Sequence, residues 1–316
     1  MYNVWKTVSR HVILALAFWM PAERRIRLER WLRGREEFRK LGLADAVIVS
    51  YGKAGRTWLR VMISRYLKLA YGLRGERLIG FDNFHKQDAR VPRLFFTHDN
   101  YLRDYTGAGE SRRDFRDKRV VLLVRNPQDT AVSQYFQWKF RMRSRKKGLN
   151  QYPDDGADVS VHDFVMRPES GLPKILAFMN AWAEEIPQMK EALIVRYEDM
   201  RADPIETLRR VVRFLGCPDD DAAVRAAVEY ASVENMRKLE SEKKFWLSGS
   251  RMKAKDESNP DSFKVRRAKV GGYRDYFDDE QIARIDALVA ERLSPLYGYD
   301  GAAPATARAR AEEPRS

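Results

Sequence analysis

Lys53 and Arg56 stand in a short segment, 50–58, whose residue types suit the binding of an anion. The segment reads SYGKAGRTW and directly follows the apolar run 46–49. An apolar run, a turn and a helical pattern predict a buried strand that leads into a helix. Backbone N–H groups and the helix dipole then point at an anion in the turn, and the two cations add to that attraction. The segment therefore predicts an anion-binding turn.

The segment 125–133 repeats this arrangement with other polar groups. It reads RNPQDTAVS, follows the apolar run 120–124, and brings Arg125 and the hydroxyl of Ser133 to the turn. If both turns follow strands of one parallel sheet, they lie at the same edge of it. Two anion-binding turns at one edge predict a single ligand with two separated phosphate groups.

The first turn is not the Walker A loop of nucleotide-hydrolysing enzymes. That motif places Lys after its second glycine, followed by a hydroxyl residue for Mg²⁺, whereas Lys53 precedes Gly55. The second strand is followed by Arg125, where many P-loop enzymes have an aspartate for the metal. The residue types therefore favour phosphate binding by cations and hydroxyls, and no metal site is predicted. A P-loop-like kinase stays an alternative.

Both segments resemble motifs of the sulfotransferases that use 3′-phosphoadenosine 5′-phosphosulfate (PAPS). That family's 5′-phosphosulfate loop reads YPKSGTTW where residues 51–58 read YGKAGRTW, and its 3′-phosphate motif RNPxDxxxS matches residues 125–133. Its YED(L/M) stretch is matched within 196–200, and its RKGxxGDWK element by RRAKVGGYR at 266–274. Because the matches keep the family's order, the chain is identified as a member, similar to bacterial types.

The resemblance implies that PAPS is the donor and leaves as 3′,5′-ADP after transfer to an acceptor hydroxyl. His98 occupies the place of the family's catalytic His, so we expect it to take the proton from the hydroxyl, with Asp99 as the alternative base. Lys53 is expected to stabilise the charge on the leaving phosphate. The matched positions assign donor binding to Lys53, Ala54, Gly55, Arg56, Thr57, Trp58, Arg125, Ser133, Tyr197, Ser232, Arg266, Arg267 and Ala268.

Several positions depart from the family's pattern, and four of them bear on phosphate binding and sulfuryl transfer. Ala54 replaces a Ser, which removes one hydroxyl donor, and Ala268 replaces a Gly. Arg56 replaces a Thr, and we expect it to supply a charge-assisted bond to the 5′-phosphate instead. Phe96 stands where the family has a Lys, so a second cation at the sulfuryl group has to come from Arg56 or another residue.

Apolar runs that alternate with helical patterns indicate an α/β fold, a P-loop-like parallel β-sheet flanked by helices on both faces. The predicted strands are 46–49, 93–97, 120–124 and 192–196. The predicted helices are 57–71, 128–139, 172–186, 204–215 and 280–293. The predicted organisation is a basic and apolar helical N-terminal segment (1–45), a sulfotransferase domain (46–300) and a disordered tail (301–316).

The chain carries a formal net charge of +14. Such a charge suits an anionic donor, an acidic acceptor or an anionic membrane surface, and no nucleic-acid-binding motif accompanies it. Part of the excess lies in 139–147, which holds six Lys or Arg and no acid. We expect this run to form a mobile flap at the mouth of the active site. The single Cys217 excludes an intramolecular disulfide and favours a reducing cytoplasm.

The N-terminal segment has two interpretations. Residues 12–20 form an apolar run too short to cross a bilayer, and no small-residue cleavage site follows it. Tryptophans interleaved with Lys and Arg over residues 5–33 suit a helix in a membrane interface, which would place the protein peripherally on the inner face of the membrane. The alternative is a helix packed on the domain itself or on a second subunit. The sequence does not indicate the oligomeric state.

The acceptor is predicted only as a class. Aromatic residues next to the basic run suit stacking on a sugar face or on a phenol: Tyr135, Phe136, Trp138 and Phe140. Together with the basic run and the N-terminal segment, they favour the hydroxyl of a carbohydrate or glycolipid. Outside the enzymes, a non-catalytic, basic, membrane-associated binding protein stays the alternative.

Overall fold

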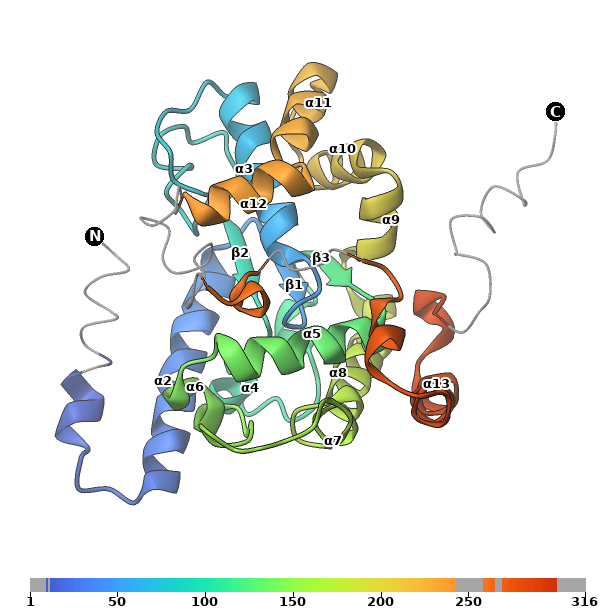
Figure 1. Cartoon of the computed structure of the whole chain (residues 1–316). Coiled ribbons are helices and arrows are strands. Elements are labelled where there is room, and N and C mark those ends of the chain that lie inside the picture. Colours follow the sequence, from blue (N-terminus) through green and yellow to red (C-terminus); the bar gives the residue numbers. More distant parts are fainter. Residues whose placement is uncertain (1–9, 11, 243–257, 265–268, 300–316) are drawn as a thin grey trace.

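A four-stranded parallel sheet forms the centre of the protein (Figure 1). The computed structural model describes residues 10, 12–242, 258–264 and 269–299. The strand order is β2-β1-β3-β4, with β1 at Ala46–Ser50, β2 at Leu94–Thr97, β3 at Arg119–Val124 and β4 at Glu191–Arg196. All three strand pairs are parallel, so a crossover connects successive strands.

Helices cover both faces of the sheet because successive strand residues point to opposite sides. Ile48 and Val121 face one core, and Val49 and Leu122 face the other. The first core includes residues of α3 (Arg56–Ala70), α9 (Tyr197–Ala202), α10 (Pro204–Phe214), α11 (Asp221–Tyr230) and α12 (Val233–Ser241). The second includes residues of α4 (Leu102–Thr106), α5 (Pro127–Phe140), α7 (Val161–Met166), α8 (Leu172–Glu185) and α13 (Asp279–Arg292). This confirms the predicted fold class.

Each predicted strand and helix is present within one residue of its predicted bounds. The basic run is different from the expected flap. Its first residues belong to α5 and its last to a further helix, α6 (Ser144–Leu149). The side chain of Lys147 is buried and pairs with Asp155. The run is therefore anchored to the domain.

Helix α2 (Ala22–Leu43) packs against α4 and joins the N-terminal segment to the sheet domain. The approach is closest at Gly34, where a Cβ atom would lie 2.2 Å from the carbonyl oxygen of Tyr101. Only glycine leaves room for that contact. Arg30 adds a hydrogen bond from Nη1 to the carbonyl oxygen of Leu149 at 2.9 Å. From Ala22 onward, the segment thus packs on the domain's own surface.

Three further expectations concern the ends of the chain and its cysteine. Among the described residues, no helix is both long and apolar enough to cross a membrane. The predicted tail, 301–316, lies outside the described residues. Cys217 is buried, and burial raises the pKa of its thiol to about 11. It is therefore a packed thiol with a low tendency to ionise.

Candidate active site

A cavity of about 910 Å³ lies where the four strands end. Its volume is at the upper end of the range of about 300–1,000 Å³ for ligand sites, so it suits a large ligand or two ligands side by side. The residues that line it include Tyr51 and Lys53 after β1, His98 after β2, Arg125 and Ser133 after β3, and Tyr197 after β4. Both predicted anion-binding turns therefore open into one cavity.

The turn between β1 and α3 has a backbone that few residues adopt. Lys53 and Gly55 have φ angles of 70° and 95°. A Cβ atom at Gly55 would also lie 2.6 Å from Cδ2 of Tyr197, so glycine is required for conformation and for space. The side chain of Ala54 is buried in the core. The cavity is lined by the rest of the predicted loop, namely Lys53, Gly55, Arg56, Thr57 and Trp58.

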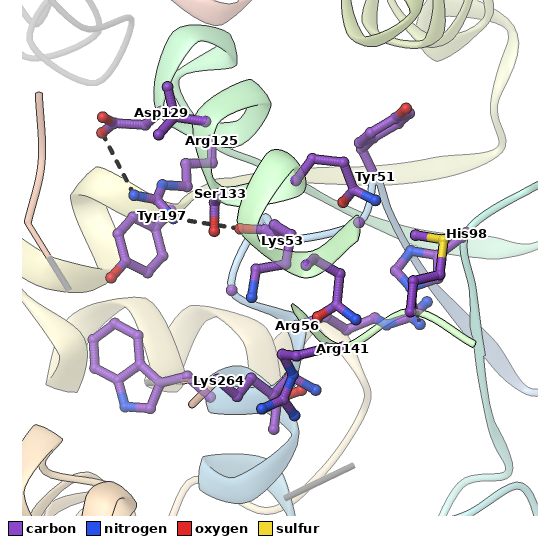
Figure 2. A pocket seen from close by; sticks show the side chains of 18 of the residues that line it. Tyr51, Lys53, Arg56, His98, Arg125, Asp129, Ser133, Arg141, Tyr197 and Lys264 are labelled. Carbon is purple, nitrogen blue, oxygen red and sulfur yellow. Dashed lines mark hydrogen bonds and ion pairs between the residues drawn. The ribbon is translucent and has the colours of Figure 1, made fainter. Parts of the chain in front are cut away.

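The turn between β3 and α5 brings Arg125 to the first turn. Asn126 caps α5 by accepting a hydrogen bond from the N–H of Asp129 at 2.9 Å. Nη1 of Arg125 donates to the carbonyl oxygen of Lys53 at 3.4 Å, and its guanidinium lies 4.5 Å from the ring centre of Tyr197 (Figure 2). Its Nε is buried and has no hydrogen-bond partner among the described residues. Such a buried, unpartnered donor suits a bound anion.

Asp129 holds a third segment against α5. Its carboxylate accepts hydrogen bonds from the N–H groups of Gly271 at 2.8 Å and Tyr273 at 3.0 Å. Lys269, on the same segment, accepts a bond from Arg125 through its carbonyl oxygen at 3.3 Å and lines the cavity. The predicted donor-binding residues Arg266, Arg267 and Ala268 lie outside the described residues. The sequence indicated Asp129 only by its place in the motif.

Both ring nitrogens of His98 are bonded. Nδ1 lies 2.7 Å from the carbonyl oxygen of Ser50, and Nε2 lies 2.5 Å from Nη2 of Arg56 (Figure 2). Because a carbonyl only accepts and a guanidinium only donates, Nδ1 carries the proton and Nε2 is the acceptor. Burial, and then the charge of Arg56, holds the pKa of His98 well below its usual value. The ring is therefore neutral, as a base must be, but its lone pair points at Arg56.

Trp58 and Tyr197 form an aromatic wall of the cavity. Their ring centres are 5.9 Å apart in an edge-on arrangement, and Nε1 of Trp58 donates to the carbonyl oxygen of Ala231 at 2.7 Å. Ser232, predicted to contact the adenine, instead caps α12 by accepting a hydrogen bond from a backbone N–H of that helix. The residues of α12 that line the cavity are Val233 and Met236.

A sequence model of the sulfotransferase domain family matches residues 43–296. The chain belongs to the sulfotransferase family. Its fold is similar to the crystal structure of mouse sulfotransferase SULT7A1 complexed with PAP, with a TM-score of 0.53 at 20% identity over 79% of this chain and 84% of that one. It is also similar to retinol dehydratase in a complex with retinol and PAP, with a TM-score of 0.52 at 17% identity over 82% and 85% of the two chains.

Curated relatives of this sulfotransferase agree with the family. Flavonol 3-sulfotransferase of Flaveria bidentis is 27% identical over 60% of this chain and 59% of that protein. Cytosolic sulfotransferase 5 of Arabidopsis thaliana is 22% identical over 79% of each chain. The family identifies the protein as an enzyme and confirms the resemblance seen in its motifs. Neither the kinase nor the non-catalytic alternative has such support.

The sulfotransferase has two cations in the cavity that were not predicted as site residues. Lys264 and Arg141 lie together near Lys53 (Figure 2). Arg141 forms a buried ion pair with Glu240, with 3.2 Å between Nη1 and Oε1. Burial, and then the charges of Lys53, Arg141 and Arg56, lower the pKa of Lys264 well below its usual value. Four basic side chains packed so closely are suited to a polyanionic ligand.

Phe96 stands at the place of the family's second lysine, and its ring forms a cation–π contact with Arg60. The guanidinium of Arg60 lies 3.8 Å from the centre of that ring, and both residues line the cavity. Lys264 and Arg60 are therefore available, besides Arg56, to supply the second cation. No sequence motif indicated Lys264, because it reaches the cavity from a segment far along the chain.

The four aromatic residues expected to stack on the acceptor do not line the cavity, so that expectation was wrong. Tyr135, Phe136 and Trp138 are buried in the second core, and Phe140 packs against it. The rings of Tyr135 and Trp138 contact Phe164 of α7, and the ring of Phe136 contacts Tyr276. Other aromatic and polar residues form the wall next to His98, including Tyr51, Tyr101, Tyr152, Asn100, Arg33 and Lys174.

Two carboxyl groups lie near His98, and only one lines the cavity. Asp99, the alternative base, is buried and paired with Arg112, with 3.1 Å between Oδ2 and Nε. Glu37, on α2, lines the cavity and accepts a hydrogen bond from the hydroxyl of Thr97 at 3.5 Å. Burial and the charge of Asp99 raise the pKa of Glu37 to about 7. Among the described residues, no three His, Cys, Asp or Glu side chains are grouped to hold a metal ion.

Proposed function

We propose that this sulfotransferase moves a sulfuryl group from PAPS to a hydroxyl of a carbohydrate or glycolipid and releases 3′,5′-ADP. The main support for PAPS as the donor is the position of Arg125. It contacts the first turn at Lys53 and the third segment at Lys269, and its Nε is buried without a partner among the described residues. The two solved structures described above hold PAP, the product of that donor.

The parts of the donor fit distinct parts of the cavity. Arg125 and Ser133 would hold the 3′-phosphate. The first turn, 51–58, would hold the 5′-phosphosulfate, with its cations and the N-terminus of α3 facing the anion. Trp58 and Tyr197 would contact the adenine, whose flat apolar surface suits two aromatic rings.

The transfer itself needs a base and a preplaced positive charge. The acceptor oxygen attacks sulfur in line with the bridging oxygen of the 5′-phosphate, as in phosphoryl transfer. His98 would take the hydroxyl proton at Nε2. Lys53 and Lys264 would stabilise the negative charge that grows on the leaving phosphate. His98 would thus act on the attacking hydroxyl, and the two lysines would act on the leaving phosphate.

The wall next to His98 supports a carbohydrate as the acceptor. Tyr51, Tyr101 and Tyr152 present rings and hydroxyls, which suits the mixed apolar and polar faces of a sugar. Lys174 and Arg33 add positive charge, so the sugar would be an acidic one. Burial and the nearby Arg30 lower the pKa of Lys174 to about 8, and an anionic acceptor would reverse that shift.

A screen with radiolabelled PAPS tests this function. The acceptors are an acidic polysaccharide, a neutral polysaccharide, a lipid-linked sugar and simple phenols, and the inactive control is Lys53→Ala. We expect label in a carbohydrate or lipid-linked sugar. Transfer to phenols alone would contradict the acceptor, and a wild-type protein that never converts PAPS to 3′,5′-ADP would contradict the donor.

We also propose that the protein is cytoplasmic and associates peripherally with the inner face of the membrane. The support is a cluster of exposed apolar residues, Leu16, Phe18 and Trp19, of which the last two are each 74% exposed. Exposed arginines follow at Arg24 and Arg25. Such a combination suits an anionic interface. Phe18→Ser with Trp19→Ser should release the protein from vesicles of phosphatidylglycerol and phosphatidylcholine; unchanged co-sedimentation would remove the proposal.

A further inference from the structure

Arg56 donates a hydrogen bond to Nε2 of His98, the atom whose lone pair would accept the proton of the acceptor. Its Nη2 lies 2.5 Å from Nε2 of His98, and its Nη1 donates to the carbonyl oxygen of Thr97. The other ring nitrogen, Nδ1, donates to the carbonyl oxygen of Ser50 at 2.7 Å. The ring is fixed in position by these bonds, but no lone pair faces a substrate.

We infer that Arg56 blocks His98 until the donor binds, and that the phosphosulfate of the donor draws the guanidinium away from the ring. This inference rests on the role of His98 as the base, proposed above. Its consequence is an order of events, because an acceptor hydroxyl can give its proton to Nε2 only after the donor is in place.

A phosphate oxygen is a stronger partner for Arg56 than a neutral imidazole. The bond to His98 has one charged partner, whereas a bond to phosphate adds the attraction of opposite charges, and the planar fork of Arg can bind two phosphate oxygens at once. Arg56 is the first residue of α3 and lines the cavity with Lys53 and Thr57, where the 5′-phosphosulfate is proposed to bind. The threonine of the family's loop has no guanidinium, so the block is specific to sequences with Arg at this position.

The charges around His98 favour the same order. Burial lowers the pKa of His98 most, followed by Arg56 from α3, and Lys146 from α6 and Lys264 lower it further. Glu37, on α2, bonds to the neighbouring Thr97 rather than to the ring. The negative charge of the donor opposes the three cations. Donor binding therefore frees Nε2 and raises the pKa of the ring at the same time.

Once Arg56 has moved, the transfer balances without another reactant. The acceptor oxygen forms a bond to sulfur while its proton passes to Nε2 of His98. The bond between sulfur and the bridging oxygen of the 5′-phosphate breaks, and its electron pair leaves with 3′,5′-ADP. The imidazolium then releases its proton to solvent, and Arg56 returns to the ring as 3′,5′-ADP leaves.

The test is the pH titration of His98, followed by NMR on histidine-labelled protein. The chain has four histidines, and His98→Gln assigns the signal. In unliganded protein we expect a pKa well below the usual range, and 3′,5′-ADP at saturation should raise it. Arg56→Thr should raise it without a ligand. The matched control is Arg65→Thr, which removes an arginine of the same helix that lies over the Tyr230 ring at 5.1 Å and should change nothing.

Two comparisons separate movement of Arg56 from a simple charge effect. In Arg56→Thr, 3′,5′-ADP should shift the pKa less than in the wild type, because no guanidinium is left to move. The inference would be overturned if 3′,5′-ADP shifted the pKa of His98 equally in both proteins. It would also be overturned if His98 had the same pKa in the unliganded wild type and in unliganded Arg56→Thr. Arg56→Lys keeps the charge but lacks the fork that bridges Thr97 and His98, so the pKa of His98 in this variant should lie between its values in the wild type and in Arg56→Thr.

The proposed base is tested by a separate readout, the turnover of His98→Ala. If that variant keeps full turnover while the titrations shift as expected, the assignment of the base is wrong and the movement of Arg56 stands. If the titrations do not shift but His98→Ala loses turnover, the base stands and the block by Arg56 is wrong.

Discussion

Asp129 accepts a hydrogen bond from the backbone N–H of Tyr273 at 3.0 Å, across 144 residues of sequence. A second bond, from Gly271 at 2.8 Å, makes this one carboxylate the anchor of the third segment. Asp129→Asn would leave one buried N–H facing an amide N–H₂, which costs about 1–3 kcal/mol. We expect calorimetry to show a loss of 3′,5′-ADP affinity of that order. An exposed control on α13, Asp279→Asn, should bind normally, and a normal affinity of Asp129→Asn would contradict the anchoring role.

Arg125 should decide selectivity for the 3′-phosphate. Removing a charge from a desolvated, hydrogen-bonded pair costs about 2–5 kcal/mol. Arg125→Ala should therefore weaken 3′,5′-ADP binding by that amount and 5′-AMP binding far less. Arg125→Lys keeps the charge without the fork, so its affinity for 3′,5′-ADP should lie between those of the wild type and Arg125→Ala. If calorimetry shows that Arg125→Ala weakens the binding of both nucleotides equally, Arg125 contacts the 5′-phosphate or serves packing instead.

Lys264 should take up a proton when the donor binds. Burial and neighbouring cations lower its pKa in the unliganded protein, and a bound polyanion raises it again. Between those two pKa values binding captures a proton, so affinity should increase as pH falls through that interval. Titration of 3′,5′-ADP in buffers of different ionisation enthalpy measures the uptake. Lys264→Met should lower the uptake, leaving only the share taken by other groups such as His98; an unchanged uptake in this variant would assign the proton elsewhere.

Gly34 should be essential for the docking of α2. A Cβ atom there would lie 2.2 Å from the carbonyl oxygen of Tyr101, whereas a Cβ atom at Gly42 of the same helix meets nothing within 4 Å. Gly34→Ala should lower the free energy of unfolding by about 1–3 kcal/mol, as overpacking does. Turnover should fall too, because Arg33 and Glu37 of α2 line the cavity. Gly42→Ala is the matched control; equal stability of the two variants would mean that α2 is not docked there.

The sheet and the two anion-binding turns were predictable because their signals are local. Strands buried on both faces read as continuous apolar runs, and the turns that follow them carry cations and glycines. Gly55 is an example, since its positive φ is a property of the loop itself. Within the described residues, the predicted loop residues other than Ala54 line one cavity.

What escaped prediction depends on tertiary contacts between distant segments. Lys264 enters the cavity because its segment packs against α5 and its backbone N–H donates a hydrogen bond to Glu240 of α12. Helix α2 carries charges on all sides and shows little amphipathic pattern, so the sequence does not indicate which face is buried, and its contact with α4 decides its position. The aromatic residues of α5 were wrongly assigned to the acceptor because most positions of that helix are buried, which removes the amphipathic signal.

The central claim is sulfuryl transfer from PAPS with His98 as the base, and its most direct test is the conversion of PAPS to 3′,5′-ADP by His98→Ala beside the wild type. Loss of a general base lowers turnover by about 10²–10⁴-fold. We expect that loss in His98→Ala with 3′,5′-ADP affinity nearly unchanged, whereas Lys53→Ala should lose both turnover and affinity. Folded His98→Ala protein with near wild-type turnover would contradict the claim and make Glu37, a carboxyl group near His98 that lines the cavity, the next residue to test.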